Sequence, residues 1–212
     1  MKKIVIIGDS GHSKVVADLI HSNEDMSVIA KLDDRYDDVN ESEGVTKGPI
    51  SYLRQLLQDE PSTCVVFGIG SNAVRKKLLN ELELPRTSFI SLIHPTAVIS
   101  PSAVIGLGTV VMPRVVVNAD AKIGDHTILN TGSIIEHDCK VADYAHISPQ
   151  AIIAGGVVVG EGTHIGAGAS VIPMRTVGDW ATVGAGAAVV SDIPSNVTAV
   201  GVPAKEIRKE GI

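Results

Sequence analysis

Aromatic residues are scarce in this chain of 212 residues. Phe, Tyr and Trp together make up 3% of the sequence, whereas hydrophobic residues make up 44%. The apolar core must therefore be built from Val, Ile, Leu and Ala. Glycine is abundant instead, and the 21 glycines predict many tight turns, because glycine adopts backbone angles that other residues avoid.

Cysteines and long apolar runs are also few. The two cysteines, Cys64 and Cys139, provide no disulfide framework and fit a reduced, cytoplasmic setting. No stretch approaches the length of a membrane span, and the apolar run at residues 4–7 is too short for a signal peptide. A net charge of −6 and a pI near 5.6 argue against a nucleic-acid surface. We therefore expect a cytoplasmic protein without membrane insertion and without a nucleic-acid partner.

The first 92 residues alternate between strand-like and helix-like segments. Apolar runs predict strands at residues 3–7, 28–32 and 64–69, with a further short strand at 89–92. Helical spacing predicts helices at 14–20, 50–57 and 72–82, the last one capped by Ser71 or Asn72. This alternation predicts an α/β domain over residues 1–92, with a small Rossmann-like parallel sheet and helices packed on it.

From Ile93 onward, an aliphatic residue recurs at every sixth position without a break in register. The seventeen positions are Ile93, Ile99, Ile105, Val111, Val117, Ile123, Leu129, Ile135, Val141, Ile147, Ile153, Val159, Ile165, Val171, Val177, Val183 and Val189. Two residues before most of them stands a small residue. This is the hexapeptide repeat of a parallel β-helix, which we place at residues 93–192, followed by a C-terminal loop and tail at 193–212.

Each hexad predicts one short flat strand and one corner, so that three hexads close a triangular coil. The aliphatic residue fills the interior, and residues eighteen positions apart should stack in adjacent coils about 4.8 Å apart. Val115, Val157 and Arg175 depart from the small-residue position. The large side chain of Arg175 predicts a bulge near residues 173–177.

Several short motifs, taken together with the hexads, resemble one family. They are Gly8-Asp9-Ser10-Gly11-His12, Leu32-Asp33-Asp34, Gly70-Ser71-Asn72, Asn130-Thr131, Ile135-Glu136-His137-Asp138, His146 and Gly201-Val202-Pro203-Ala204-Lys205. Over nearly its whole length the chain is similar to the NeuD/PglD group of sugar O- and N-acyltransferases, which have a left-handed β-helix. The resemblance implies a homotrimer, acetyl-CoA in the groove between neighbouring β-helices, a sugar nucleotide held by the N-terminal domain, and a role in surface or exopolysaccharide biosynthesis. The family often has a GxGGH turn, so Asp9 would place an unusual negative charge beside the diphosphate.

His137 and Asp138 are the candidates for catalysis. Acyl transfer from a thioester needs a base for the proton of the attacking group, and an imidazole beside a carboxylate suits that role near neutral pH. His137 follows the interior residue Ile135 by two positions, so its side chain belongs near a corner or the outer surface. Spacing alone favours a solvated surface histidine. The resemblance implies catalysis by His137, with Asp138 orienting it.

Gly155 lies eighteen residues after His137 and should stack beside it. A glycine there leaves room for a thioester, and its N–H could donate to the developing oxyanion. A corner glycine needed only for its turn is the equally weighted alternative. The resemblance implies acetyl-CoA contacts for Gly155 and His146, and we predict a further contact at Ala167. Lys205, Arg208 and Lys209 could attract the CoA phosphates, whereas a solvated basic tail is the alternative explanation for them.

His146 and His164 are also eighteen residues apart and should stack. Stacked histidines could bind a metal, as in the β-helical carbonic anhydrases. A third ligand is not clearly in register, since neither His126 nor His137 matches, so we expect no metal. Asn130 either binds substrate or belongs to a structural asparagine ladder at a corner.

The turn at residues 8–13 follows a strand and opens a helix, and helix N-termini bind phosphates through free N–H groups. The turn is not the fingerprint of NAD-binding proteins. The predicted substrate-binding residues are Gly11, His12, Asp33, Asp34, Gly70, Asn72 and Asn130. A pair of solvated turn residues is the alternative explanation for Asp33 and Asp34. Arg75, Lys76 and Lys77 could bind phosphate, although a charged helix face explains them equally well.

The function that these residues favour is transfer of an acetyl group from acetyl-CoA, as co-substrate, to the amine of a UDP-linked amino sugar. Acetylation of a sugar hydroxyl stays open, because the sequence does not separate the two acceptors. A β-helical metalloenzyme of the carbonic anhydrase type and a non-catalytic nucleotide-sensing module are the alternatives from other classes.

Overall fold

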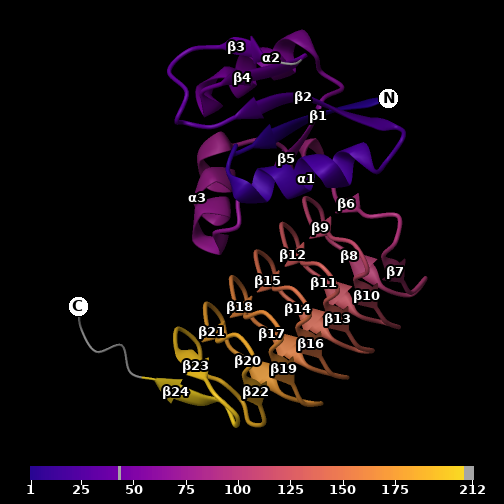
Figure 1. Ribbon diagram of the computed structural model, residues 1–212, viewed down its shortest axis with the longest axis vertical. Helices are drawn as coiled ribbons and strands as arrows, with labels where there is room; N and C mark the ends of the chain where they lie inside the picture. Colours follow the sequence, from indigo (N-terminus) through magenta and orange to yellow (C-terminus); the bar gives the residue numbers. More distant parts are fainter. Residues whose placement is uncertain (43, 208–212) are drawn as a thin grey trace.

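The computed structural model describes residues 1–42 and 44–207, which form an α/β domain and a β-helix (Figure 1). The α/β domain contains β1 (Lys2–Ile7), α1 (Gly11–His21), β2 (Met26–Leu32), β3 (Asn40–Ser42), β4 (Val45–Gly48), η1 (Ile50–Tyr52), α2 (Leu53–Asp59), β5 (Cys64–Phe67), α3 (Asn72–Leu82) and η2 (Arg86–Ser88). Its strands form one sheet in the order β3-β4-β2-β1-β5. The β3–β4 pair is antiparallel and the other neighbours are parallel, which confirms the predicted parallel sheet with helices.

Helices cover this sheet on both faces because successive residues of β1 point in opposite directions. Ile4 and Ile6 belong to the core that contains α1, whereas Val5 and Ile7 belong to a second core with residues of α2. All four are fully buried. Continuous apolar runs such as this one are typical of a parallel strand buried on both sides.

The structure differs from the predicted elements at two points in this domain. The β3–β4 hairpin was not predicted, because Asn40–Ser42 is polar and exposed and carries no apolar pattern. The predicted strand at residues 89–92 is wrong: Phe89 makes a single bridge to Val65, and Leu92 already begins the β-helix.

The second half repeats a two-residue strand every six residues, as predicted. The strands are β6 (Leu92–Ile93), β7 (Val98–Ile99), β8 (Val104–Ile105), β9 (Val110–Val111), β10 (Val116–Val117), β11 (Lys122–Ile123), β12 (Ile128–Leu129), β13 (Ile134–Ile135), β14 (Lys140–Val141), β15 (His146–Ile147), β16 (Ile152–Ile153), β17 (Val158–Val159), β18 (His164–Ile165), β19 (Ser170–Val171), β20 (Thr176–Val177), β21 (Thr182–Val183) and β22 (Ala188–Val189). Each interior strand pairs in parallel with the strand eighteen residues later, for example Lys122 with Lys140. The left-handed parallel β-helix is therefore confirmed.

The stacked strands form the three faces of a triangular prism. The domain face contains β6, β9, β12, β15, β18 and β21; the apolar face contains β7, β10, β13, β16, β19 and β22; the lysine face contains β8, β11, β14, β17 and β20. The chain visits these faces in that order in every coil. Figure 1 shows the α/β domain lying against the domain face near β6 and β9.

From Gly108 to Gly186, one residue at each corner adopts a left-handed backbone, and such residues recur every six positions. Six of them are glycines, and the others include Asp120, Asp138, Tyr144 and Met174, with φ between 59° and 60°. Side chains other than glycine are uncommon in this conformation, although Asp and Asn tolerate it. The corner conformation therefore fixes the direction in which the Asp138 carboxylate leaves the backbone.

The last coils differ from the prediction. No bulge interrupts the coil at residues 173–177, because Thr176 pairs in register with Val158. The side chain of Arg175 instead reaches toward the carboxylate of Asp192, at 3.7 Å. After Val189, where the sequence predicted a loop and tail, the chain forms the hairpin β23 (Thr198–Val200) and β24 (Lys205–Ile207), which extends the domain face. Arg208 and Lys209 lie outside the described residues.

A buried arginine joins the two domains. Arg75 on α3 is 1% exposed, and its guanidinium donates to the carbonyls of His126 (3.1 Å) and Tyr144 (2.7 Å) at the corner between the lysine face and the domain face. It also donates to the carbonyls of Ile69 and Gly70 in its own domain. These carbonyls satisfy the donors of the guanidinium, so Arg75 serves the domain interface and is not placed to bind phosphate.

Candidate active site

His137 lies at the corner between the apolar face and the lysine face, directly after β13. Its Nδ1 is 2.8 Å from Oδ2 of Asp138, whose left-handed backbone turns the carboxylate back toward the preceding ring. The hydrogen bond that Nδ1 donates to Asp138 raises the pKa of His137 above its ordinary value, against a smaller effect of desolvation. When Nδ1 donates to this carboxylate, Nε2 is left as the proton acceptor.

Gly155 stacks one coil away from His137, as predicted. The N–H of Gly156 donates to the His137 carbonyl at 2.9 Å. A Cβ added at Gly155 would lie 2.6 Å from His137 Nε2, so the accepting nitrogen faces a wall without a side chain. Among the hydrogen bonds of residues 1–42 and 44–207, none uses the Gly155 N–H.

A hollow of about 640 Å³ opens beside His137, within the usual size range of small-molecule sites. Its walls include Asp120, Lys122, Lys140 and Met174, which sequence reasoning missed. Asp120 lies eighteen residues before Asp138 and Met174 lies thirty-six residues after it, so the repeat places both in the same column as Asp138. All the described residues that line the hollow belong to the β-helix, so the α/β domain of the same chain contributes nothing to it.

Three histidines gather on the domain face, where the α/β domain packs. The rings of His146 and His164 stack with centroids 5.0 Å apart, and His12 lies 6.4 Å from His146. The amide of Asn130 is 3.1 Å from Nε2 of His146, so Asn130 belongs to this group and to no interior ladder. Burial lowers the pKa of His146 to about 3 and that of His12 to about 4, so both are neutral near pH 7.

A metal site does not emerge from these histidines. Within the described ranges, no group of three or more His, Cys, Asp or Glu side chains is arranged to hold a metal ion. The same ranges contain no helix long and apolar enough to cross a membrane.

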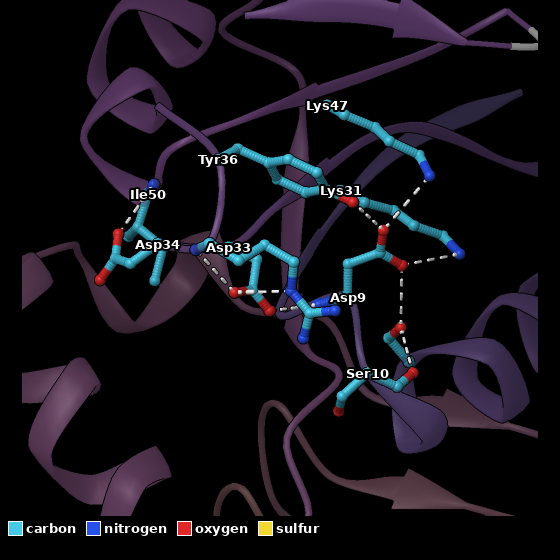
Figure 2. Close-up of polar contacts among 10 residues, drawn as sticks. Asp9, Ser10, Lys31, Asp33, Asp34, Tyr36, Lys47 and Ile50 are labelled. Carbon is cyan, nitrogen blue, oxygen red and sulfur yellow. Dashed lines mark hydrogen bonds and ion pairs between the residues drawn. The ribbon is translucent and has the colours of Figure 1, made fainter. Parts of the chain in front are cut away.

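A second hollow, of about 400 Å³, lies where β1 and β2 end and α1 begins. In open α/β sheets, ligands bind at the carboxyl ends of the strands. Asp33 and Asp34 both line this hollow. The carboxylate of Asp33 is occupied by the N–H groups of Asp9 (2.7 Å) and Arg35 (3.1 Å), whereas Asp34 accepts from the Ile50 N–H at 3.2 Å on one oxygen (Figure 2). Asp34 therefore has more accepting capacity left for a ligand.

Asp9 does not present a free charge to this hollow. Figure 2 shows its carboxylate surrounded by the Tyr36 hydroxyl at 2.5 Å and by the ammonium groups of Lys31 (3.5 Å) and Lys47 (3.3 Å). Burial opposes ionisation, but the Tyr36 hydrogen bond and the two lysines together lower the pKa of Asp9. The negative charge expected beside a diphosphate is thus compensated within the protein.

The structure distributes the predicted site residues over separate places. His137, Asp138 and Gly155 share one corner. Asn130 and Ala167 lie at the other edge of the apolar face, next to the histidines of the domain face, and Asp33 and Asp34 lie at the sheet edge.

The remaining predicted residues lie elsewhere. The Asn72 amide donates to the Gly162 carbonyl at 2.9 Å and so joins the domains, whereas the Gly70 carbonyl accepts from Arg75 within the α/β domain. Gly11 is exposed at the start of α1, and Lys205 is exposed on β24.

Known families match both halves of the chain. Residues 3–82 match the PglD N-terminal domain, and residues 120–155 and 138–173 match the bacterial transferase hexapeptide (six repeats). The chain is 45% identical over 112 residues to the UDP-N-acetylbacillosamine N-acetyltransferase of Bacillus subtilis, which covers 53% of this chain and 52% of that protein. The match thus spans about half the length of this curated relative.

Two solved structures match nearly the whole chain. A mutant of perosamine N-acetyltransferase from Caulobacter crescentus, in complex with CoA and GDP-perosamine, is 38% identical with a TM-score of 0.89, covering 99% of this chain and 98% of that one. The acetyltransferase domain of PglB from Neisseria gonorrhoeae, in complex with acetyl coenzyme A, is 36% identical with a TM-score of 0.85, covering 97% and 99%. The chain belongs to the PglD-type family of hexapeptide-repeat sugar acetyltransferases.

Proposed function

We propose that this protein transfers the acetyl group of acetyl-CoA to the amine of a UDP-linked amino sugar. The observation that supports this most is the position of His137, whose accepting Nε2 faces the bare wall of Gly155 inside a hollow large enough for a thioester and an amine. The names of the relatives add that sugar N-acetyltransferases share this fold over the whole chain.

In the proposed reaction, the sugar amine attacks the thioester carbonyl, so that an N–C bond forms and the C–S bond breaks. Nε2 of His137 takes the proton that the amine loses, and the same proton can then pass to the departing thiolate. Asp138 holds Nδ1 and stabilises the imidazolium that forms. The N–H of Gly155 is the proposed donor to the oxyanion.

The proposed site is completed by a second copy of the chain. The corner of His137 and the corner of Asn130 and Ala167 are the two edges of the apolar face. This face has a column of aliphatic side chains at Val98, Val116, Ile134 and Ile152, of which Val98 is 64% exposed and Ile152 is 43% exposed. If three copies pack these faces around a threefold axis, the His137 corner of one copy meets the Asn130 corner of the next.

This homotrimer brings the α/β domain of one copy beside the His137 hollow of its neighbour. The sugar nucleotide would lie with its nucleoside at the hollow of Asp34 and its amine toward the neighbour's imidazole. Acetyl-CoA would occupy the groove between two β-helices, with Gly155 on one wall and Ala167 on the other. We propose that the enzyme acts in the cytoplasm, in surface or exopolysaccharide biosynthesis, where acetyl-CoA and sugar nucleotides are both available.

Thiol release from acetyl-CoA tests this function. UDP- and GDP-linked amino sugars and their hydroxyl counterparts would be offered to the wild type and to His137→Ala. We expect release with a UDP-linked amine and a loss of about 10²- to 10⁴-fold in the variant, the usual contribution of a general base. Release with hydroxyl sugars alone would replace the N-acetyltransferase by an O-acetyltransferase, and full activity of His137→Ala would refute the mechanism.

A further inference from the structure

Two lysines lie one above the other beside the proposed reaction centre. Lys122 and Lys140 are register partners on the parallel strands β11 and β14, and both side chains are exposed on the lysine face. Both line the hollow of His137, and both also line a neighbouring hollow of about 390 Å³ farther across the same face. The two lysines therefore bridge the two hollows.

The two like charges repel each other, and a bound anion would relieve this repulsion. Stacked strands bring the backbones of the two lysines to about 4.8 Å, and like charges directly opposite each other are destabilising. None of the ion pairs formed by residues 1–42 and 44–207 includes either lysine. Three acidic groups line these hollows: Asp138 is engaged by His137, Asp179 accepts from the Glu161 N–H at 2.8 Å, and Asp120 is in no ion pair of the described residues with either lysine.

We propose that Lys122 and Lys140 form an anion subsite that binds a phosphate group of a co-substrate, a role that rests on the proposed function. Two ammonium groups on a flat wall offer several donors to phosphate oxygens, and lysine is a common phosphate ligand. Both co-substrates carry phosphates, so the chemistry alone does not separate the sugar nucleotide from CoA.

The position of the two lysines along the prism axis favours the sugar nucleotide as the source of the bound phosphate. The strands of Lys122 and Lys140 run directly into the corners of His126 and Tyr144, which Arg75 of the α/β domain contacts. If three copies assemble around an axis parallel to the prism, the α/β domain of the neighbouring copy lies at the same position along that axis as the α/β domain of this copy. The diphosphate of a nucleotide held by that domain would therefore pass the two lysines on its way to His137.

Calorimetric titration of the assembled protein with UDP, GDP and CoA separates the sources. We expect Lys122→Gln/Lys140→Gln to bind UDP about tenfold or more weakly than the wild type, which corresponds to the loss of one charge-assisted contact. The Lys122→Arg/Lys140→Arg protein keeps the charge and should stay within about threefold. Lys2→Gln removes an exposed charge outside both hollows and should bind as the wild type does.

A selective loss of CoA affinity would support the anion subsite and assign it to CoA. Unchanged affinity for all three probes, or a wild type that binds none of them, would overturn the subsite. Thiol release by the wild type is measured in parallel. If the wild type binds UDP through the lysines and yet acetylates no sugar, the proposed function fails while the subsite stands.

Discussion

His137 owes its orientation to the backbone of the residue that follows it. Asp138 occupies a left-handed corner, and this conformation returns its carboxylate to within 2.8 Å of the ring. Asn tolerates the same backbone conformation, whereas most side chains do not. The charge of Asp138 can therefore be removed without changing the corner.

Asp138→Asn should move the pH dependence of the reaction. The carboxylate raises the pKa of His137, so the wild type needs a higher pH before Nε2 is free to accept a proton. Without the charge, the acidic limb of the kcat/KM profile should shift to lower pH, and the plateau should fall because the base is weaker and less well oriented. Unchanged positions of the limb in a kcat/KM profile from pH 5 to 9 would show that His137 does not titrate in catalysis.

Gly155→Ala tests the wall opposite His137. Its backbone lies outside the left-handed region, so alanine is tolerated there, but the new methyl would meet Nε2 at 2.6 Å and Cε1 at 2.7 Å. The exposed ring must turn away, and we expect kcat to fall by about two orders of magnitude, as for a misplaced catalytic group. The melting temperature should change little, and a fully active variant would contradict a reaction centre between Gly155 and His137.

The sequence predicts single contacts only where they follow from the repeat. The step of eighteen residues placed Gly155 beside His137 and stacked His146 on His164. The surroundings of Asp9 could not be predicted, because Lys31, Tyr36 and Lys47 come from separate segments that meet through an unpredicted hairpin. The sequence also could not separate Asp33 from Asp34 as candidate ligand-binding residues. The N–H groups that occupy the Asp33 carboxylate are brought to it by the geometry of the turns, which the sequence does not show.

Helix α3 holds the two domains together through charge on its inner side. Arg75 is buried, and desolvation lowers its pKa to about 10, so it stays charged near pH 7. The sequence gives no sign of this burial, since Arg75 stands beside Lys76 and Lys77 in what reads as one charged helix face. Arg75 is buried because the corner carbonyls of His126 and Tyr144 point toward α3 and accept from its guanidinium.

Arg75→Ala should destabilise the protein strongly. It leaves several buried carbonyls without donors and opens a void, for which we expect a loss of about 3–5 kcal/mol in the free energy of unfolding. The matched control is Arg86→Ala, because Arg86 pairs with Asp125 across the same interface but its side chain is 74% exposed. That pair should contribute less than about 1 kcal/mol. Chemical denaturation measures both, and equal losses would contradict the role assigned to burial.

The His137 hollow and the Asp34 hollow share no lining residue among the described residues of one chain, and we propose that the two parts of the site meet between copies. The sequence predicted the prism and its register because the hexad is periodic. It could not predict which face the α/β domain covers, since that depends on contacts between segments with no shared period. The uncovered column from Val98 to Ile152 is the surface on which we expect assembly.

Ile152→Lys should separate the copies. A charge placed in an apolar contact is desolvated without a partner, which disfavours association. Light scattering should give three times the chain mass of 22.1 kDa for the wild type and a smaller mass for the variant, together with lost activity. Val39→Lys, at a similarly exposed site in the α/β domain, should keep the wild-type mass. A monomeric wild type at micromolar concentration would refute the shared site.

The unbroken spacing of the coils fixes the distance along the prism between any two residues of the β-helix. Inserting eighteen residues between His126 and His137 would preserve the strand pairing of the coils, yet it would displace the imidazole by about 4.8 Å along the prism from the His126 corner that Arg75 contacts. That displacement exceeds the reach of a proton transfer. We therefore expect a chain lengthened in this way to keep its β-helix and to lose activity.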